Sequence, residues 1–276
     1  MASIKTHTVS GGGGLNLHVQ ETGNPDGKPI LFLHGLSQCR LTWNKQLHSD
    51  LARDFRLVAM DLRGHGRSEK PRDVYGDSRL WADDVHAVIQ SLRLDRPVLS
   101  GSSYGGIVIA DYVLHYGEDG IAGTNWVGAI SRLGEPIIES GFIGAEFLTA
   151  APAFFSENVE DSATALERLV RLSFPREPAP EDLYFFLGFN VIVPPHVRQG
   201  LFARTLDHDP VIQRMRKPML LSYGKRDAVV LPAMGKHIAG LAPHAKLSIY
   251  QSAGHVPYWQ APTRFNRELR ELRDSA

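Results

Sequence analysis

The chain has a single cysteine, Cys39, among its 276 residues. One cysteine cannot form a disulfide within the chain, and it excludes the cysteine-rich zinc sites of small metal-stabilised domains. Neither sign of charge is in excess, because 30 lysines and arginines balance 30 aspartates and glutamates. The basic footprint that attracts nucleic acids or anionic membranes is therefore missing. We expect a small-molecule partner rather than a nucleic acid or a membrane, and either a monomer or a homodimer.

Long apolar runs are also absent. None approaches the roughly 18 residues that a membrane-spanning helix requires. The N-terminal residues 1–7 lack the apolar stretch of about 7–15 residues that marks a secretory signal. We therefore expect a cytoplasmic protein. Its length and its hydrophobic content of 43% are sufficient for a large core without disulfide bonds or structural metals.

Short apolar runs alternate with amphipathic helical patterns along most of the chain. Runs that are apolar on both faces are typical of buried parallel strands. We expect strands near residues 29–33, 56–60, 97–100, 125–130, 219–223 and 246–250. Between them, Trp81, Val85, Val88 and Leu92 follow the spacing of one helix face. This alternation predicts an α/β sheet with right-handed crossovers.

Two segments do not follow this alternation of strands and helices. Residues 6–20 hold four consecutive glycines between two short β-like stretches, which predicts an antiparallel hairpin at the sheet edge with a flexible glycine turn. Residues 132–215 are rich in Phe, Pro, Glu and Ala and contain helix-like pieces but no convincing buried strand. We interpret them as a helical cap inserted into a core domain made of residues 1–131 and 216–276.

Residues 101–105 read Gly-Ser-Ser-Tyr-Gly and match the pattern G-x-S-x-G, with Ser103 at its centre. The pattern alone is weak, but here it directly follows an apolar strand and precedes a helix expected over 107–116. That context is what a nucleophile elbow requires, because a tight turn presents the serine hydroxyl above the sheet. Ser102 is adjacent but does not satisfy the spacing. Ser103 is therefore the candidate nucleophile.

A nucleophilic serine needs a base and an acid, which follow it in the order Ser, Asp or Glu, His. His255 comes just after the last expected strand, and Asp227 just after the preceding one. Carboxyl ends of parallel strands collect catalytic groups at one edge of the sheet. Glu135 remains an alternative acid, because it follows the strand near residue 130. We interpret His34, His65, His208 and His244 as structural or surface residues.

Ester chemistry also needs donors for the developing oxyanion. One N–H is expected from the residue after the nucleophile, Tyr104. The second is expected from the loop after the first apolar run, which reads His-Gly-Leu-Ser over 34–37, and we assign it to Leu36. The tyrosine side chain either narrows the pocket or offers its hydroxyl to a ligand.

Together these residues resemble an α/β-hydrolase-fold serine hydrolase. The chain is similar to the group of lid-bearing esterases, cofactor-free haloperoxidases and C–C hydrolases, and the likeness covers nearly its whole length. It implies a mostly parallel eight-stranded sheet flanked by helices, with a helical cap after strand six. It also implies that residues 61–68, Asp-Leu-Arg-Gly-His-Gly-Arg-Ser, form a structural turn, and that Trp43 lies near the site entrance. The Gly-Pro-Gly oxyanion loop common in C–C hydrolases is missing.

The activity we expect is hydrolysis of a carboxylic ester or lactone of a small, mainly apolar substrate, with no metal or organic cofactor. Phe154 and Phe155 of the cap, together with Trp43 and Val256, are the candidate pocket residues. The same triad would also suit C–C bond hydrolysis or a perhydrolase or haloperoxidase activity. A ligand receptor that reuses the fold is a further alternative, because the fold does not determine the function.

Overall fold

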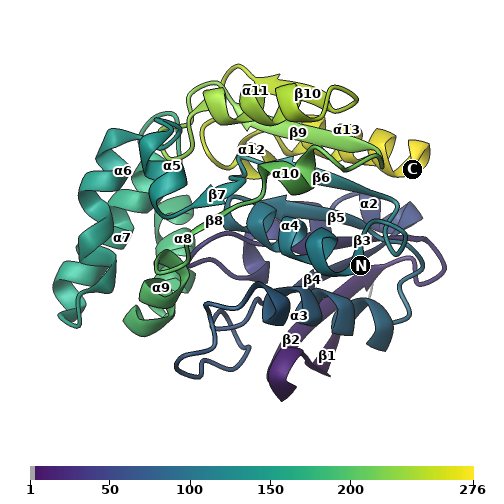
Figure 1. Cartoon of the computed structure of the whole chain (residues 1–276), viewed down its shortest axis with the longest axis horizontal. Coiled ribbons are helices and arrows are strands. Elements are labelled where there is room, and N and C mark those ends of the chain that lie inside the picture. The colour runs from purple at the N-terminus through teal and green to yellow at the C-terminus, as the bar shows by residue number, and fades with distance from the viewer. Residues whose placement is uncertain (1–3) are drawn as a thin grey trace.

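An eight-stranded sheet crosses the molecule in the computed structural model, which describes residues 4–276 (Figure 1). Its strand order is β1-β2-β4-β3-β5-β6-β9-β10, with β1, β2 and β4 paired antiparallel and the other neighbours parallel. The strands are β1 (Lys5–Ser10), β2 (Asn16–Gly23), β3 (Lys28–Leu33), β4 (Phe55–Met60), β5 (Val98–Ser102), β6 (Gly123–Val127), β9 (Met219–Gly224) and β10 (Lys246–Tyr250). Residues 1–3, part of the stretch tested for a secretory signal, lie outside the described residues. The expected mostly parallel α/β sheet is confirmed.

Helices cover both faces of this sheet, as the pattern of β3 requires. Leu31 and Leu33 belong to one hydrophobic core, and Ile30 and Phe32 belong to the other, because successive strand residues point to opposite faces. The first core includes residues of α3 (Ser78–Ser91), α4 (Tyr104–Tyr116) and α11 (Pro232–Leu241). The second includes residues of η2 (Arg40–Trp43), α1 (Asn44–Leu47), α2 (Leu51–Asp54), α12 (Pro257–Gln260) and α13 (Pro262–Ser275). Across residues 4–276, no helix has the length and apolar character needed to cross a membrane.

The chain between β6 and β9 forms a separate group of helices beside the carboxyl ends of the strands (Figure 1). We call them the cap helices: α5 (Glu135–Glu139), α6 (Ala145–Ala150), η3 (Ala151–Phe155), α7 (Val159–Leu172), α8 (Pro180–Val191) and α9 (Pro195–Phe202). A two-stranded ribbon of β7 (Arg132–Leu133) and β8 (Leu206–Asp207) precedes and follows them, and α10 (Asp209–Ile212) leads back to the sheet. The domain boundaries at 132 and 215 stay a prediction.

In the glycine turn between β1 and β2, Gly12 packs against α3. Gly12 begins the short helix η1 (Gly12–Gly14), and a Cβ on it would lie 2.6 Å from the Leu80 carbonyl oxygen. Its amide donates to Asp84 Oδ1 over 2.8 Å, and its carbonyl oxygen accepts from Arg63 Nη2 over 3.1 Å. α3 therefore packs directly against Gly12, whereas Gly13 and Gly14 are exposed and have positive φ, so the expected flexibility of the turn stays a prediction.

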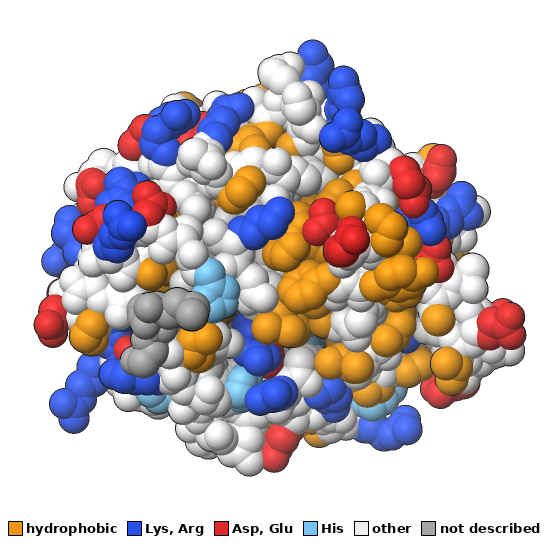
Figure 2. All heavy atoms as spheres, turned by 180° about the vertical axis from the view of Figure 1, so that it is seen from behind, with side chains coloured by type: hydrophobic (Ala, Val, Ile, Leu, Met, Phe, Trp, Pro, Cys, Tyr) orange, Lys and Arg blue, Asp and Glu red, His pale blue; other side chains and the backbone are white. Residues whose placement is uncertain are grey.

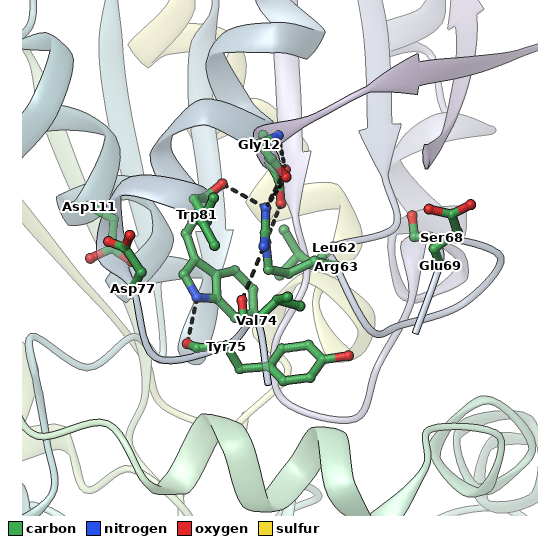
Figure 3. Close-up of polar contacts among 12 residues, drawn as sticks. Gly12, Leu62, Arg63, Ser68, Glu69, Val74, Tyr75, Asp77, Trp81 and Asp111 are labelled. Carbon is green, nitrogen blue, oxygen red and sulfur yellow. Dashed lines mark hydrogen bonds and ion pairs between the residues drawn. The ribbon is translucent and has the colours of Figure 1, made fainter. Parts of the chain in front are cut away.

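Arg63 joins this turn to α3 (Figure 3). Its guanidinium pairs with both oxygens of buried Asp84, at 2.7 and 2.8 Å, and donates to the carbonyl oxygens of Val74 and Leu80. Every acceptor around the guanidinium is thus a carboxylate or a backbone carbonyl. The surroundings of Arg63 fit the expectation that the segment 61–68 is a folding element.

We expect D84A to lower the free energy of unfolding by about 3–5 kcal/mol, because it leaves the buried Arg63 charge without its partner. The matched control is D83A, next to it on α3, which removes a partly exposed ion pair with Arg79 and a hydrogen bond from the Tyr116 hydroxyl. Such pairs contribute less than about 1 kcal/mol. Urea unfolding of both variants measures the difference, and equal losses would contradict the account.

Candidate active site

Ser103 occupies a strained turn between β5 and α4. Its φ of 52° and ψ of −114° fall in a region that residues other than glycine rarely adopt. The surroundings enforce it, because the Ser103 amide donates to the Val127 carbonyl oxygen of β6 over 2.9 Å. Strain that is held in this way is characteristic of functional residues. The serine therefore lies at the carboxyl ends of the central strands, beside the cap.

The two glycines of the motif allow α4 to approach the sheet. A Cβ on Gly101 would lie 2.5 Å from the Gly105 carbonyl oxygen, and one on Gly105 would lie 2.6 Å from the Leu33 carbonyl oxygen. Both distances are too short for any side chain. The motif spacing is thus explained by backbone contacts on either side of Ser103.

His255 and Asp227 meet at the ends of β10 and β9. His255 Nδ1 lies 2.8 Å from Asp227 Oδ2, and both side chains are buried. The other carboxylate oxygen accepts the amides of Val229 and Val230 over 2.8 and 2.9 Å, so the acid is held at both oxygens. Because Oδ2 can only accept from the ring, Nδ1 carries the proton and Nε2 is left as the basic nitrogen.

The surroundings of the His255–Asp227 pair differ from those of the alternative acid, Glu135. Gly128, with φ of +49°, faces the pair, and a Cβ there would lie 3.1 Å from His255 Nδ1 and 3.3 Å from Asp227 Oδ2. Glu135 instead begins α5 with an exposed side chain, and it is not among the residues that line the adjacent cavity. The structure therefore brings His255 to Asp227.

Hydrogen bonds hold the loop after β3 and leave one of its backbone amides without an acceptor among the described residues. Gly35 donates its N–H to Gln38 Oε1 over 3.1 Å, and Gln38 donates its own to the Gly35 carbonyl oxygen over 3.2 Å. Ser37, at φ of 56°, donates to His65 Nε2 over 3.2 Å. The Leu36 amide has no acceptor among the described residues, and its side chain lines the cavity. The Tyr104 amide is at the first position of α4, where no helical acceptor exists.

Two buried histidines support this loop and its neighbour. His34 donates through Nδ1 to the Gly35 carbonyl oxygen over 2.8 Å and accepts the Leu62 amide at Nε2 over 3.0 Å. His65 donates in the same way to the Arg63 carbonyl oxygen over 2.8 Å. Burial lowers the pKa of His34 to about 4 and that of His65 to about 3, so both stay neutral near pH 7. Both histidines thus support the neighbouring loops through hydrogen bonds.

An apolar cavity of about 260 Å³ adjoins Ser103 and His255. The cap helices and the loops around them supply most of its wall: Ile137, Ile138, Ile143, Phe147, Leu148, Ala151, Pro152, Phe155, Leu169, Val170, Phe186, Leu201 and Phe202. The sheet side adds Leu36, Tyr104, Ile130, Leu133, Val229 and Val230. Apolar side chains also gather on the outer surface at this end of the molecule (Figure 2). The space next to the serine therefore favours apolar groups.

Three of the four predicted pocket residues lie outside this wall, and only Phe155 belongs to it. Trp43 is fully buried in the other core, with its ring 4.4 Å from that of Tyr258. Val256 is buried in that core too. Phe154 packs behind the wall, 5.6 Å from the Phe147 ring. The prediction that Trp43, Phe154 and Val256 line the pocket is therefore wrong, because these side chains are buried in the hydrophobic cores.

Sequence reasoning missed the residues that attach the cap to the site. The Ser173 carbonyl oxygen, just after α7, accepts the His255 amide over 2.9 Å. Gln260 donates to the same oxygen over 3.3 Å and accepts the Gly254 amide over 2.7 Å. The Tyr104 hydroxyl accepts a hydrogen bond from Arg204, which comes from the chain after α9. No motif marks these residues, because each acts through the tertiary packing.

The neutral histidines predict a pH dependence of stability. Their pKa values in the folded chain lie below the unfolded value near 6.5, so the unfolded chain binds the extra protons first. Stability is therefore lost as the pH falls from about 6.5 toward the folded pKa, by about 2 kcal/mol per histidine at pH 5. We expect H65Q to show a smaller loss of unfolding free energy between pH 7 and pH 5 than the parent chain, measured with urea. The control is H244Q, which removes an exposed histidine, and an equal change in both variants would contradict the account.

Comparison with known proteins shows the family to which the chain belongs. The family model described as alpha/beta hydrolase fold matches residues 28–262. The crystal structure of an esterase from Rhodococcus sp. ECU1013 is 34% identical, with a TM-score of 0.92 and 98% of each chain covered. A non-heme chloroperoxidase of Streptomyces lividans is 34% identical over 95% of this chain and 97% of the relative. A bifunctional esterase/perhydrolase of Acinetobacter calcoaceticus is 29% identical over 93% and 95%. The chain therefore belongs to the alpha/beta hydrolase fold family.

Proposed function

We propose that the chain is a serine hydrolase that cleaves a carboxylic ester or lactone of a small, mainly apolar substrate. The observation that carries the proposal is that one apolar cavity is lined both by Ser103, on its strained turn, and by His255, which is paired with Asp227. The similarity to the Rhodococcus esterase supports the reaction class.

In the proposed mechanism His255 Nε2 removes the proton from Ser103 Oγ as the oxygen attacks the carbonyl carbon. Asp227 keeps the ring in the required tautomer and stabilises the imidazolium that forms. The amides of Leu36 and Tyr104 donate to the oxygen that becomes negative, and donors of this kind contribute about 2.7–4 kcal/mol each to the transition state. His255 then returns the proton to the leaving alcohol.

The second half of the reaction repeats these roles with water. His255 takes a proton from a water molecule, which attacks the acyl carbon bound to Ser103, and the acid product leaves. Most of the cavity wall is apolar, and apart from Ser103, Tyr104 and His255 its polar side chains are Gln38, Ser173 and Asn190. Substrate affinity therefore comes from apolar contact, and an acyl or alcohol part that is aliphatic or aromatic fits this wall.

Perhydrolysis is a second candidate, favoured by the similarity to the bifunctional esterase/perhydrolase. It would use the same acyl-enzyme, with hydrogen peroxide in place of water as the attacking group. Assays of p-nitrophenyl ester turnover, and of peracid formed from a carboxylate and peroxide, separate the two activities.

We expect S103A to lower kcat/KM for p-nitrophenyl butyrate by a factor of about 10⁴ or more, because the nucleophile is lost. The matched control is S102A, which removes the neighbouring buried hydroxyl and should retain activity within about twofold. A fluorophosphonate probe should label the parent chain and S102A but not S103A. Full activity in S103A would overturn the mechanism.

The acid is tested by comparing D227N with E135Q. We expect D227N to lower kcat by about 10³- to 10⁴-fold, because the amide presents the wrong tautomer partner to His255. E135Q alters an exposed side chain outside the cavity and should leave kcat within about twofold. The opposite ranking would move the acid role to Glu135.

A further inference from the structure

Arg204 connects the end of the cap to the helix that follows the serine. It is 3% exposed and comes from the segment between α9 and β8. Its Nη1 donates to the Tyr104 hydroxyl over 2.8 Å, and its Nη2 donates to both oxygens of Asp111, at 3.0 and 2.9 Å. Tyr104 and Asp111 are seven residues apart on α4 and so lie on the same face, about two turns apart. One guanidinium therefore spans the first part of α4.

Further buried contacts fix this guanidinium in place. Its Cζ lies 5.6 Å from the Trp81 ring centre and 5.9 Å from that of Tyr104, whose ring is 5.3 Å from Trp81. His208 Nε2, also buried, lies 2.9 Å from Asp111 Oδ1. A planar guanidinium with five donors can bind a carboxylate and a hydroxyl at once, which a lysine ammonium cannot do with the same geometry. All members of the cluster of Tyr104, Trp81, Asp111, Arg204 and His208 are buried.

The position of this cluster matters because the side chain and the backbone amide of Tyr104 have different roles. Its side chain belongs to the cluster and to the cavity wall, and its amide is the proposed oxyanion donor at the first turn of α4. The N–H of a residue in the first turn of a helix has no acceptor within the helix, so the orientation of this amide depends more on the side chain and on the preceding turn. The only polar contact of the Tyr104 hydroxyl within the described residues is Arg204.

We propose that Arg204 is a positioning residue for the oxyanion hole: by binding the Tyr104 hydroxyl and Asp111 together, it holds the Tyr104 amide toward the developing oxyanion. The inference rests on the proposed serine hydrolase function. Arg204 touches no reacting atom, so its effect passes through Tyr104. Interactions that exist mainly in the transition state change kcat, while those that also exist in the ground state change KM.

The experiment compares R204K and Y104F with the parent chain. R204K keeps the charge beside Asp111, and Y104F removes only the hydroxyl. For each we would measure kcat and KM for p-nitrophenyl butyrate, and the inhibition constant of an aryl trifluoromethyl ketone. Ser103 Oγ adds to that ketone, the carbonyl electron pair moves to its oxygen, and His255 takes the serine proton, so the adduct places an oxyanion in the proposed hole.

We expect both variants to lower kcat about tenfold with KM unchanged, and to raise the ketone inhibition constant by the same factor, since losing a donor outright costs about 10²- to 10³-fold. The double variant should be no worse than R204K, because both changes break one contact. The control is R198K, which alters a buried cap guanidinium bound to Phe154, Val193 and Ser162 and outside the cavity wall. It should lower the melting temperature and leave kcat within about twofold.

A purely structural Arg204 would lower the melting temperature of R204K without changing kcat or the ketone constant, and that result would overturn the inference. If R204K does not fold, Y104F decides by the same criteria. A parent chain that neither turns over the ester nor binds the ketone would instead overturn the proposed function. A parent chain that does both, with unchanged kcat in Y104F, would overturn only the role of Arg204.

Discussion

The close approach of α4 to the ends of β3 and β5 is the constraint on which the rest of the site depends. Gly105 lies against the Leu33 backbone, and Gly101 against Gly105, at distances that no Cβ would permit. Ser103 lies between these two glycines, in its positive-φ turn. The same contact places the first amide of α4 beside the loop after β3, so the proposed nucleophile and the proposed oxyanion donors depend on one backbone contact.

Burial of polar groups supplies the rigidity that this arrangement needs. His34 and His65 accept amides inside the core and are kept neutral there, and Asp227 uses one oxygen for backbone amides and the other for His255. A buried polar group that lost its partner would be costly, so each contact excludes alternative loop conformations. The loops around Ser103 are therefore determined by hydrogen bonding as much as by apolar packing.

The cap contacts the core at both sides of the proposed site. Near His255, α7 ends in the Ser173 carbonyl that accepts its amide, and the Trp259 ring lies against Phe185 and Phe186 of α8. Near Ser103, Arg204 reaches α4. The cap thus contributes both the apolar wall and contacts that hold the two halves of the site. The cavity wall and the proposed catalytic residues are therefore parts of one packed unit.

The class of sheet, the strand-turn-helix around Ser103, and the placement of Asp227 and His255 after consecutive strands could all be predicted from the sequence. They follow from local periodicity and from the order of elements along the chain. Which aromatic residues face the cavity depends instead on the folded chain. Trp43 and Phe154 are as apolar as Phe155, but Trp43 is buried against Tyr258 and Phe154 against Phe202, both distant in sequence. The choice of Asp227 over Glu135 as partner of His255, and the contact of Arg204 with Tyr104, were likewise decided by packing. They join segments about 30 and 100 residues apart, and no local pattern records which side chains meet across such separations.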